Sequence, residues 1–313
     1  MLSGAWGGDA MRSDRVAPLQ LRSDCLTLDL LAGLGGCWKA LRFCAGTGPA
    51  IDILRPLAPG STDPYASGGF ALVPWSNRLF DRQFRLPEQV LTLPANRPGI
   101  DQPVHGVVWM AAWQVEAVEP TRAVLFLAHR ANAYWPFDVE CRQSFTLEGG
   151  RARFELAVRN TSEQVMPAGV GFHPWFAADR GDRVAFQAAT VWQQDTTGLP
   201  HGALPLSEHT AFDCQHPREV SDFIVNHCYS GWGQAAVLER RTKGLQVRLR
   251  GSPALTHLMV YRPADAAWLC LEPVSHATGA WSMPALHRPE YGVQWLAPGA
   301  QFSAAMDIEV AAC

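Results

Sequence analysis

The sequence predicts an all-β protein, a large antiparallel sandwich, and three observations lead to this fold class. Several segments alternate apolar and polar residues with a period of two, the pattern of a sheet with one buried face. The 27 glycines and 23 prolines are spread along the chain and predict many short strands joined by turns. No amphipathic stretch with a 3.6-residue period is long enough to anchor a helical domain, and strand–helix alternation is missing.

The predicted strands with the clearest patterns are residues 26–30, 123–127, 151–159, 245–250 and 306–310. In 151–159 (RARFELAVR) every second residue is apolar and nearly all the others are charged, so one face of this strand is expected to be buried. Residues 123–127 (AVLFL) are apolar throughout and predict a more fully buried strand.

The segment 196–217 is rich in proline, histidine and glycine, which predicts a long surface loop. Its histidines, His201, His209 and His216, have spacings of eight and seven residues. This is not a known ligand pattern, so we expect solvent-exposed histidines here rather than the site of a metal hydrolase.

Length and composition limit the functional classes. A chain of 313 residues that is 48% hydrophobic and 18% charged is globular, and we expect one domain over residues 19–313 after a flexible tail over 1–18. The net charge is −3 with both signs dispersed, which argues against a nucleic-acid partner. No apolar run approaches the roughly 18 residues that span a bilayer, so no membrane partner is expected.

The N-terminal residues lack the apolar stretch of a signal peptide, and the eight cysteines include no CxxC pair. Scattered cysteines without an export signal favour reduced thiols in a cytoplasmic protein. A zinc site would need closer spacing than these cysteines have, so no metal is expected.

Four short segments carry residues suited to chemistry. They are PWSNRLF with Asn77 and Arg78, PVHG with His105, GVGFHPWF with His173 and Trp175, and LCLEPVSH with Glu272. Each also has an ordinary structural interpretation, since a histidine beside aromatics is often a packed core residue and a glutamate at a strand end is often a solvated cap. None of the four establishes a function alone.

Together the four segments fit one reaction, the interconversion of the anomers of an aldose. Ring opening requires one group that protonates the ring oxygen and another that removes the proton of the C1 hydroxyl. A histidine and a carboxylate suit these roles, because burial and neighbouring charges tune their pKa values towards neutrality. Aromatic side chains such as Trp175 and Phe176 would line an apolar sugar face and exclude water.

In order and spacing, these motifs resemble the aldose 1-epimerase (galactose mutarotase) family. The motifs that match are Asn77-Arg78-Leu79, His105-Gly106, 171–176 (GFHPWF) and Glu272-Pro273, framed by Gly35-Gly36 with 51–55 (IDILR) and by a closing segment with Gly292, Leu296, Pro298-Gly299 and Phe302. The resemblance covers roughly residues 20–311.

The resemblance implies a β-supersandwich with a sugar site in a groove on one sheet, and no metal or organic cofactor. His173 would be the acid at the ring oxygen and Glu272 the base at the C1 hydroxyl, converging on opposite sides of one bound pyranose. Arg78 and His105 would hold sugar hydroxyls, with Asn77 close by. The partner would be a monosaccharide, an aldose, and the protein would serve carbohydrate metabolism as a monomer or homodimer.

One residue departs from the family pattern. The family has an aspartate shortly before a Gly-Trp pair, whereas this chain has Asn226 before Gly231-Trp232. An asparagine keeps a carbonyl acceptor but loses the charge, and a charged hydrogen bond is worth about 1.5–3 kcal/mol against about 1 kcal/mol for a neutral one. We therefore expect an altered sugar preference.

Two other functions stay open. A mutarotase for hexose 6-phosphates would need basic residues for the phosphate, and Arg82, Arg85 and Arg97 are near the Arg78 and His105 segments in sequence. A non-catalytic sugar-binding or sensor protein could share the fold, although binding alone needs no acid–base pair.

Overall fold

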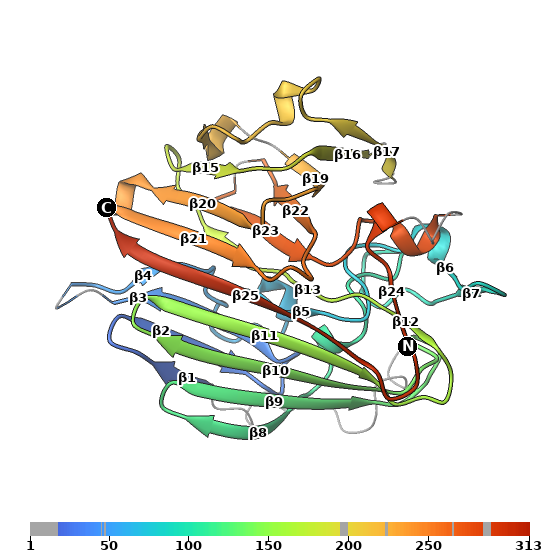
Figure 1. Cartoon of the computed structure of the whole chain (residues 1–313). Coiled ribbons are helices and arrows are strands. Elements are labelled where there is room, and N and C mark those ends of the chain that lie inside the picture. Colours follow the sequence, from blue (N-terminus) through green and yellow to red (C-terminus); the bar gives the residue numbers. More distant parts are fainter. Residues whose placement is uncertain are drawn as a thin grey trace.

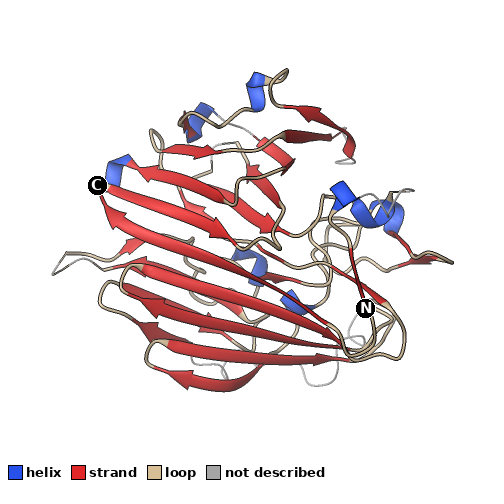
Figure 2. Cartoon of the chain, in the orientation of Figure 1, coloured by secondary structure: helices blue, strands red, loops and turns tan. Residues whose placement is uncertain are grey.

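The computed structural model describes residues 18–44, 46, 48–194, 200–222, 225–264, 266–283 and 289–313, apart from the side chain of His201. Strands are its main regular structure, and the helices among these residues are short 3₁₀ turns (Figure 2). The predicted all-β class with large antiparallel sheets is confirmed, because every pairing between the named strands of this part of the chain is antiparallel. The tail predicted over residues 1–18 lies outside the described residues except for Pro18.

The larger sheet has nine strands (Figure 1). From edge to edge they are β18 (Arg218–Glu219), β15 (Arg183–Phe186), β20 (Ala235–Arg240), β21 (Leu245–Gly251), β25 (Gln301–Ala312), β11 (Arg151–Asn160), β10 (Val139–Glu148), β9 (Arg122–His129) and β8 (Gln114–Glu119). The predicted strands in 123–127, 151–159, 245–250 and 306–310 all belong to this sheet. In β11, Ala152, Phe154, Leu156 and Val158 are buried, as the alternation predicted.

The second large sheet has eight strands and is less regular. Its strands are β17 (Pro200–Pro205), β16 (Thr190–Gln194), β19 (Val225–Ser230), β22 (His257–Arg262), β23 (Trp268–Val274), β13 (Gly171–Phe172) and β5 (Ala71–Leu72), and β14 (Trp175–Ala177) also pairs with β23. Two short strands, β13 and β14, therefore share one long neighbour, and the residues between them, His173 and Pro174, interrupt the sheet.

Smaller sheets and turns complete the fold. A four-stranded sheet contains β1 (Leu19–Arg22), β2 (Leu26–Leu31), β3 (Cys37–Phe43) and β4 (Ile51–Asp52), and two strand pairs join β12 (Met166–Ala168) to β24 (Gln294–Leu296) and β6 (Gln83–Arg85) to β7 (Val90–Thr92). The 3₁₀ turns are η1 (Pro64–Ala66), η2 (Phe80–Arg82), η3 (Val108–Met110), η4 (Thr210–Phe212), η5 (Val220–Asp222), η6 (Arg241–Lys243), η7 (Ala280–Ser282) and η8 (Pro289–Tyr291). No helix of the described part combines the length and apolarity needed to cross a membrane.

The main core joins the two large sheets. Trp38 of β3 contacts Phe154 of β11 at a ring-centroid distance of 4.3 Å and Phe172 of β13 at 6.2 Å. On β23, Leu269 and Leu271 point into this core. Successive side chains of a strand point to opposite faces, so Cys270, Glu272 and Val274 point to the other face of the eight-stranded sheet.

Two local predictions need correction. The segment 196–217 contains the strand β17 and the turn η4 rather than only a loop. Its prolines are compatible with a strand because β17 is an edge strand that pairs only with β16 among the described strands. Glu272 does not end its strand, because β23 continues through Pro273 to Val274.

Candidate active site

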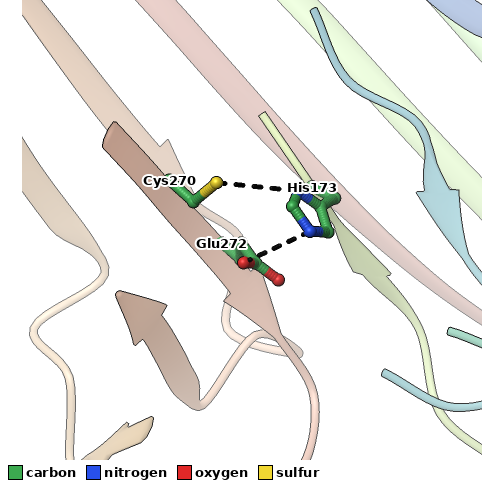
Figure 3. Close-up of side chains that lie close together, drawn as sticks. All are labelled: His173, Cys270 and Glu272. Carbon is green, nitrogen blue, oxygen red and sulfur yellow. Dashed lines mark hydrogen bonds and ion pairs between the residues drawn. The ribbon is translucent and has the colours of Figure 1, made fainter. Parts of the chain in front are cut away.

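Strand register brings His173 and Glu272 together. Gly171 lies opposite Val274, and Trp175 lies opposite Cys270. In an antiparallel pair, moving one residue forward on one strand corresponds to moving one residue backward on its partner. His173, midway between Gly171 and Trp175, therefore lies opposite Glu272. Their side chains meet at 3.5 Å between Nε2 and Oε1 (Figure 3). The predicted pair is thus a cross-strand neighbour pair on one face of the sheet.

Backbone hydrogen bonds hold the His173 segment from its other side. The N–H of His173 donates to the carbonyl of Phe70 at 3.0 Å, and the N–H of Trp175 donates to the carbonyl of Gly68 at 2.8 Å. Pro174 between them has no N–H to donate. The histidine is therefore fixed by its backbone to residues 68–70 and faces β23 with its side chain.

Four rings enclose the imidazole of His173. Phe70 stacks on it at a centroid distance of 4.7 Å, and Trp175 stacks at 5.4 Å. His105 and Tyr65 approach edge-on at 4.9 Å and 5.5 Å. The predicted aromatic residue Trp175 is part of this enclosure, which removes the acid–base candidates from bulk water.

Burial shifts the pKa values of the pair in opposite directions. Loss of solvation, helped by His105, Arg55 and Arg97, holds the pKa of His173 well below its ordinary value. Loss of solvation also raises the pKa of Glu272 well above its ordinary range. Both shifts favour uncharged forms, because a charge is poorly solvated in this site.

Asn77 and His105 are tied to each other by two hydrogen bonds. The N–H of His105 donates to the carbonyl of Asn77 at 3.0 Å, and the N–H of Asn77 donates to Nδ1 of His105 at 3.1 Å. Next to His105, Gly106 lets the chain pack against the backbone of Val73, since a Cβ there would lie 1.8 Å from the carbonyl oxygen of Val73. The Asn-Arg and His-Gly motifs are thus adjacent beside His173.

The electrostatic state of His105 follows from that contact. Because Nδ1 accepts a hydrogen bond from a backbone N–H, the proton of the neutral ring is on Nε2. Burial, with the nearby charges of Arg97 and Arg78, lowers the pKa of His105 to about 3. His105 is therefore a neutral hydrogen-bond donor across the physiological pH range.

Asn226 and Trp175 lie at two ends of one row across the sheet. Asn226 is opposite Tyr261, Tyr261 is opposite Cys270, and Cys270 is opposite Trp175. Directly paired residues point to the same face, so this row borders the His173–Glu272 pair. Asn226 is exposed and lies two strands from Cys270. Arg78 is half-buried, and its charge acts on both His105 and Tyr261.

The arrangement differs from the expected groove in one respect. The pair was predicted to converge from opposite sides of a sugar, and this is wrong for the present structure, because the two side chains are neighbours in contact. Their exposed fractions are 2% for His173 and 3% for Glu272. Tyr65 of η1 covers them, with the Arg97 guanidinium 3.8 Å above its ring and an Arg97–Asp63 ion pair of 3.2 Å beside it.

Four residues near the pair were missed from the sequence: Tyr65, Phe70, Tyr261 and Cys270. Cys270 and Tyr261 could have been found from strand parity and register, since Cys270 precedes Glu272 by two residues on β23 and Tyr261 pairs with Cys270. No local pattern marks Tyr65. Its position depends on where the chain before Asn77 returns over the sheet.

Only one of the three arginines considered for a phosphate reaches this region. Arg82 donates to the carbonyl of Asp101, and Arg85 donates to the carbonyl of Ser282. Arg97 is the one that lies over Tyr65 and influences His105 and His173.

Among the described side chains, one group could hold a metal ion: His173, Cys270 and Glu272, whose ligand atoms all lie within 4.8 Å of one another. His209 and His216 are not part of such a group there, and the side chain of His201 is outside the described part.

Comparison with known proteins gives a consistent result. The family model described as aldose 1-epimerase matches residues 20–309. An uncharacterized protein of Escherichia coli, YphB, is 26% identical over 270 residues, covering 83% of this chain and 90% of its own. The galactose mutarotase of Mus musculus is 25% identical over 266 residues, covering 79% of this chain and 74% of its own.

A similar fold occurs in a solved structure. The crystal structure of a galactose mutarotase-like protein from Clostridium acetobutylicum superposes with a TM-score of 0.82 at 18% identity, covering 97% of this chain and 98% of the other. At this identity the likeness concerns the fold, and it matches the architecture of paired large antiparallel sheets.

Proposed function

The chain belongs to the aldose 1-epimerase family, and from this premise we propose that it interconverts the α and β anomers of an aldose at His173 and Glu272. The observation that carries the proposal is the contact of these two side chains, at 3.5 Å, inside an aromatic enclosure. An imidazole and a carboxyl group in contact are equipped to take a proton from one oxygen and give one to another.

Contact between the two groups suits the chemistry of C1. The C1 hydroxyl oxygen and the ring oxygen are bonded to the same carbon, so the groups that serve them must also be close together. We assign the acid role at the ring oxygen to His173 and the base role at the C1 hydroxyl to Glu272. Tyr65 must give way for the sugar to reach them.

Ring opening then proceeds with a balanced proton count. Glu272 takes the proton of the C1 hydroxyl, and the electrons of that O–H bond form the C1 carbonyl. The bond between C1 and the ring oxygen breaks, and the ring oxygen takes the proton of His173. Rotation about C1–C2 exposes the other face of the carbonyl, and the reverse steps close the ring as the other anomer.

The pair must become charged before this step. Burial favours the neutral imidazole and the neutral carboxyl, whereas the reaction in this direction needs an imidazolium and a carboxylate. Sugar hydroxyls that replace the ring of Tyr65 supply polar groups around both side chains, which favours the charged form. A proton that passes from the carboxyl to the imidazole then has only the 3.5 Å contact to cross.

Binding residues are proposed from their positions beside the pair. The Nε2–H of His105 and the guanidinium of Arg78 are donors for sugar hydroxyls, and Asn77 fixes the ring of His105 through its backbone N–H. Trp175 supplies an apolar wall. Asn226, exposed on the same face, is within the outer part of the site and is proposed to contact a hydroxyl far from C1.

One observation favours a charged sugar as a second candidate substrate. Arg97 lies beside the site, and its Nη1 is buried with no hydrogen-bond partner among the described residues. A phosphate on the sugar would supply acceptors for this donor. Because Arg82 and Arg85 are engaged elsewhere, the free aldose stays the first candidate.

A mutarotation screen tests the proposal. Polarimetry or NMR would follow the α/β exchange of free and phosphorylated aldoses, with the Glu272→Gln variant as the control. We expect acceleration of at least one aldose by the natural protein and its loss in the variant. A protein that binds sugars yet leaves every rate unchanged would instead be a non-catalytic binding protein.

A further inference from the structure

Three donor side chains meet on one face of β23. The Sγ of Cys270 lies 3.9 Å from Nδ1 of His173, and Nε2 of the same ring lies 3.5 Å from Oε1 of Glu272 (Figure 3). Within the described part of the chain, these residues are the one group whose ligand atoms all come within 4.8 Å of one another. Acid–base catalysis uses the histidine and the glutamate and gives the thiol no task.

The carboxylate of Glu272 and the imidazole of His173 make few short hydrogen bonds. Oε2 of Glu272 is buried and has no hydrogen-bond partner among the described residues. The contact of 3.5 Å between Nε2 and Oε1 is longer than the 2.7–3.2 Å that is typical of N–H···O hydrogen bonds. Buried polar atoms are normally satisfied, and an exception calls for a ligand or another explanation.

The donor set matches a thiophilic divalent cation. Imidazole nitrogen, thiolate sulfur and carboxylate oxygen are the three ligand types that bind Zn²⁺ in proteins. Calcium and magnesium prefer sites built from oxygen alone. A thiolate and a carboxylate together neutralise a dication, so the buried cluster would gain no net charge on binding.

The backbone already orients the three ligands. Cys270 and Glu272 are alternate residues of one strand, and His173 lies opposite Glu272 in the register. Zn–S and Zn–N distances of about 2.3 Å and 2.0–2.1 Å place tetrahedral ligand atoms roughly 3.3–3.7 Å apart. At present the thiol is nearest Nδ1 of His173 and the carboxylate is nearest Nε2. One ion binds a single ring nitrogen, so the side chains must rotate to bring the thiol and the carboxylate to the same nitrogen.

We propose that His173, Cys270 and Glu272 form an inhibitory binding site for Zn²⁺ or a similar thiophilic dication. The ion binds one nitrogen of the imidazole, the sulfur of the thiolate and an oxygen of the carboxylate, and it displaces the protons of the thiol and of the carboxyl. Both catalytic groups are then unable to transfer protons. Binding is independent of the proposed function, whereas inhibition rests on it.

Cobalt binding to the full chain tests the site without an activity assay. Co²⁺ substitutes for Zn²⁺ and gives a near-ultraviolet thiolate-to-cobalt band only when a cysteine is a ligand. We expect this band at one equivalent in the natural protein. It should be absent from Cys270→Ser, and the affinity for zinc should fall about 100-fold or more, since loss of an outer-shell partner alone costs 10–100-fold.

Two further variants make the test specific. Cys228 is also fully buried, and it lies in the row of Met259 and Glu272, two strands from Glu272. Cys228→Ser should keep the band, which controls for the loss of a buried thiol. Glu272→Gln should keep the band with weaker zinc binding, because it retains the thiolate. Absence of the band in the natural protein, or its persistence in Cys270→Ser, would overturn the site.

Mutarotation measured with and without zinc separates the two proposals. Inhibition by zinc that a chelator reverses supports both. An active metal-free protein that binds no cobalt would remove the metal site and keep the enzyme. A protein that shows the cobalt band but never accelerates mutarotation would keep the metal site and remove the proposed function.

Discussion

The two large sheets of this protein differ in how regular they are. In the nine-stranded sheet, β10 and β11 pair over ten residues without a break, from Val139–Asn160 to Glu148–Arg151. In the eight-stranded sheet, β13 and β14 are short and are interrupted at His173, and buried polar groups take the place of apolar ones.

This difference suggests that the nine-stranded sheet mainly stabilises the fold, whereas the eight-stranded sheet carries the residues proposed for catalysis. The regular sheet buries an aromatic core and carries ion pairs such as Arg151–Asp307 on its surface, and its buried Arg240 is paired with Asp182 at 2.8 Å. The irregular sheet holds His173 and Glu272 away from water, an arrangement that costs stability and shifts the pKa values of the two groups proposed to transfer protons. Substitutions in the two sheets should therefore change different measured quantities.

The largest effect on activity is expected at His173, where the eight-stranded sheet is interrupted. His173→Asn should lower kcat by about 10²- to 10⁴-fold, the range in which positioned acid–base groups contribute. Sugar binding and the urea midpoint should stay close to those of the natural protein, because asparagine is smaller and neutral. A variant that keeps nearly the full rate would show that His173 is not the acid.

At Phe154 in the regular sheet, a substitution is expected to lower stability and leave kcat unchanged. This ring packs on Trp38 at 4.3 Å and on Phe145 at 5.8 Å. Phe154→Ala should reduce the free energy of unfolding by about 3–5 kcal/mol through the cavity it leaves. Urea titration measures that loss, and kcat per folded molecule should not change. A large fall in kcat at full folding would mean that the two sheets are not separable in function.

Acid sensitivity should come from the buried histidines around the site. His276 accepts a hydrogen bond from the N–H of Ser76 at 3.0 Å, and burial lowers its pKa to about 4 from 6.5. Between these values the unfolded chain binds more protons than the folded chain. The unfolding free energy should therefore fall as the pH drops from 6.5 to 4, by about 1.4 kcal/mol per pH unit for this group.

The variant His276→Gln isolates that contribution. Its amide oxygen can still accept from Ser76, but it does not titrate. Urea midpoints measured at several pH values should show a shallower acid slope than in the natural protein. Identical slopes would mean that the pKa of His276 is the same in the folded and the unfolded chain.

A smaller effect is expected at the outer part of the site. Asn226→Asp restores a charged acceptor, and the difference between a charged and a neutral hydrogen bond is about 1 kcal/mol, a factor of roughly five. Relative kcat/KM values among hexoses should change by about this factor. An unchanged sugar profile would show that Asn226 does not touch the substrate.

The smallest effect is predicted on the surface of the regular sheet. Asp307→Asn breaks the ion pairs to Arg151 and Arg153, at 2.9 Å and 3.2 Å. Solvent-accessible pairs contribute about 0.2–1 kcal/mol each, so the melting temperature should fall only slightly. Activity should be unaffected, and a loss of activity here would contradict the separation of the two sheets.

The regular sheet could be predicted from the sequence because its pattern is local. Ala152, Phe154, Leu156 and Val158 alternate with residues that face outwards, and the period of two needs no knowledge of the neighbouring strands. The segment 200–205 was misjudged because its prolines indicate a break, whereas an edge strand tolerates them.

The candidate site was predictable in its residues but not in its arrangement. The motifs pointed to His173, Glu272, Asn77 and His105, and these do lie together, although their roles stay predictions. Direct contact between His173 and Glu272 follows from register, which no local pattern reveals. The cover formed by Tyr65 depends on a chain path that only the folded structure gives.

Exchange spectroscopy by NMR tests the central claim most directly. The rate of α/β exchange at C1 would be measured for a set of aldoses with the natural protein, with His173→Asn and with Glu272→Gln at equal concentrations of folded protein. We predict acceleration by the natural protein and near-background rates for both variants. Equal rates for all three proteins would contradict proton transfer by this pair.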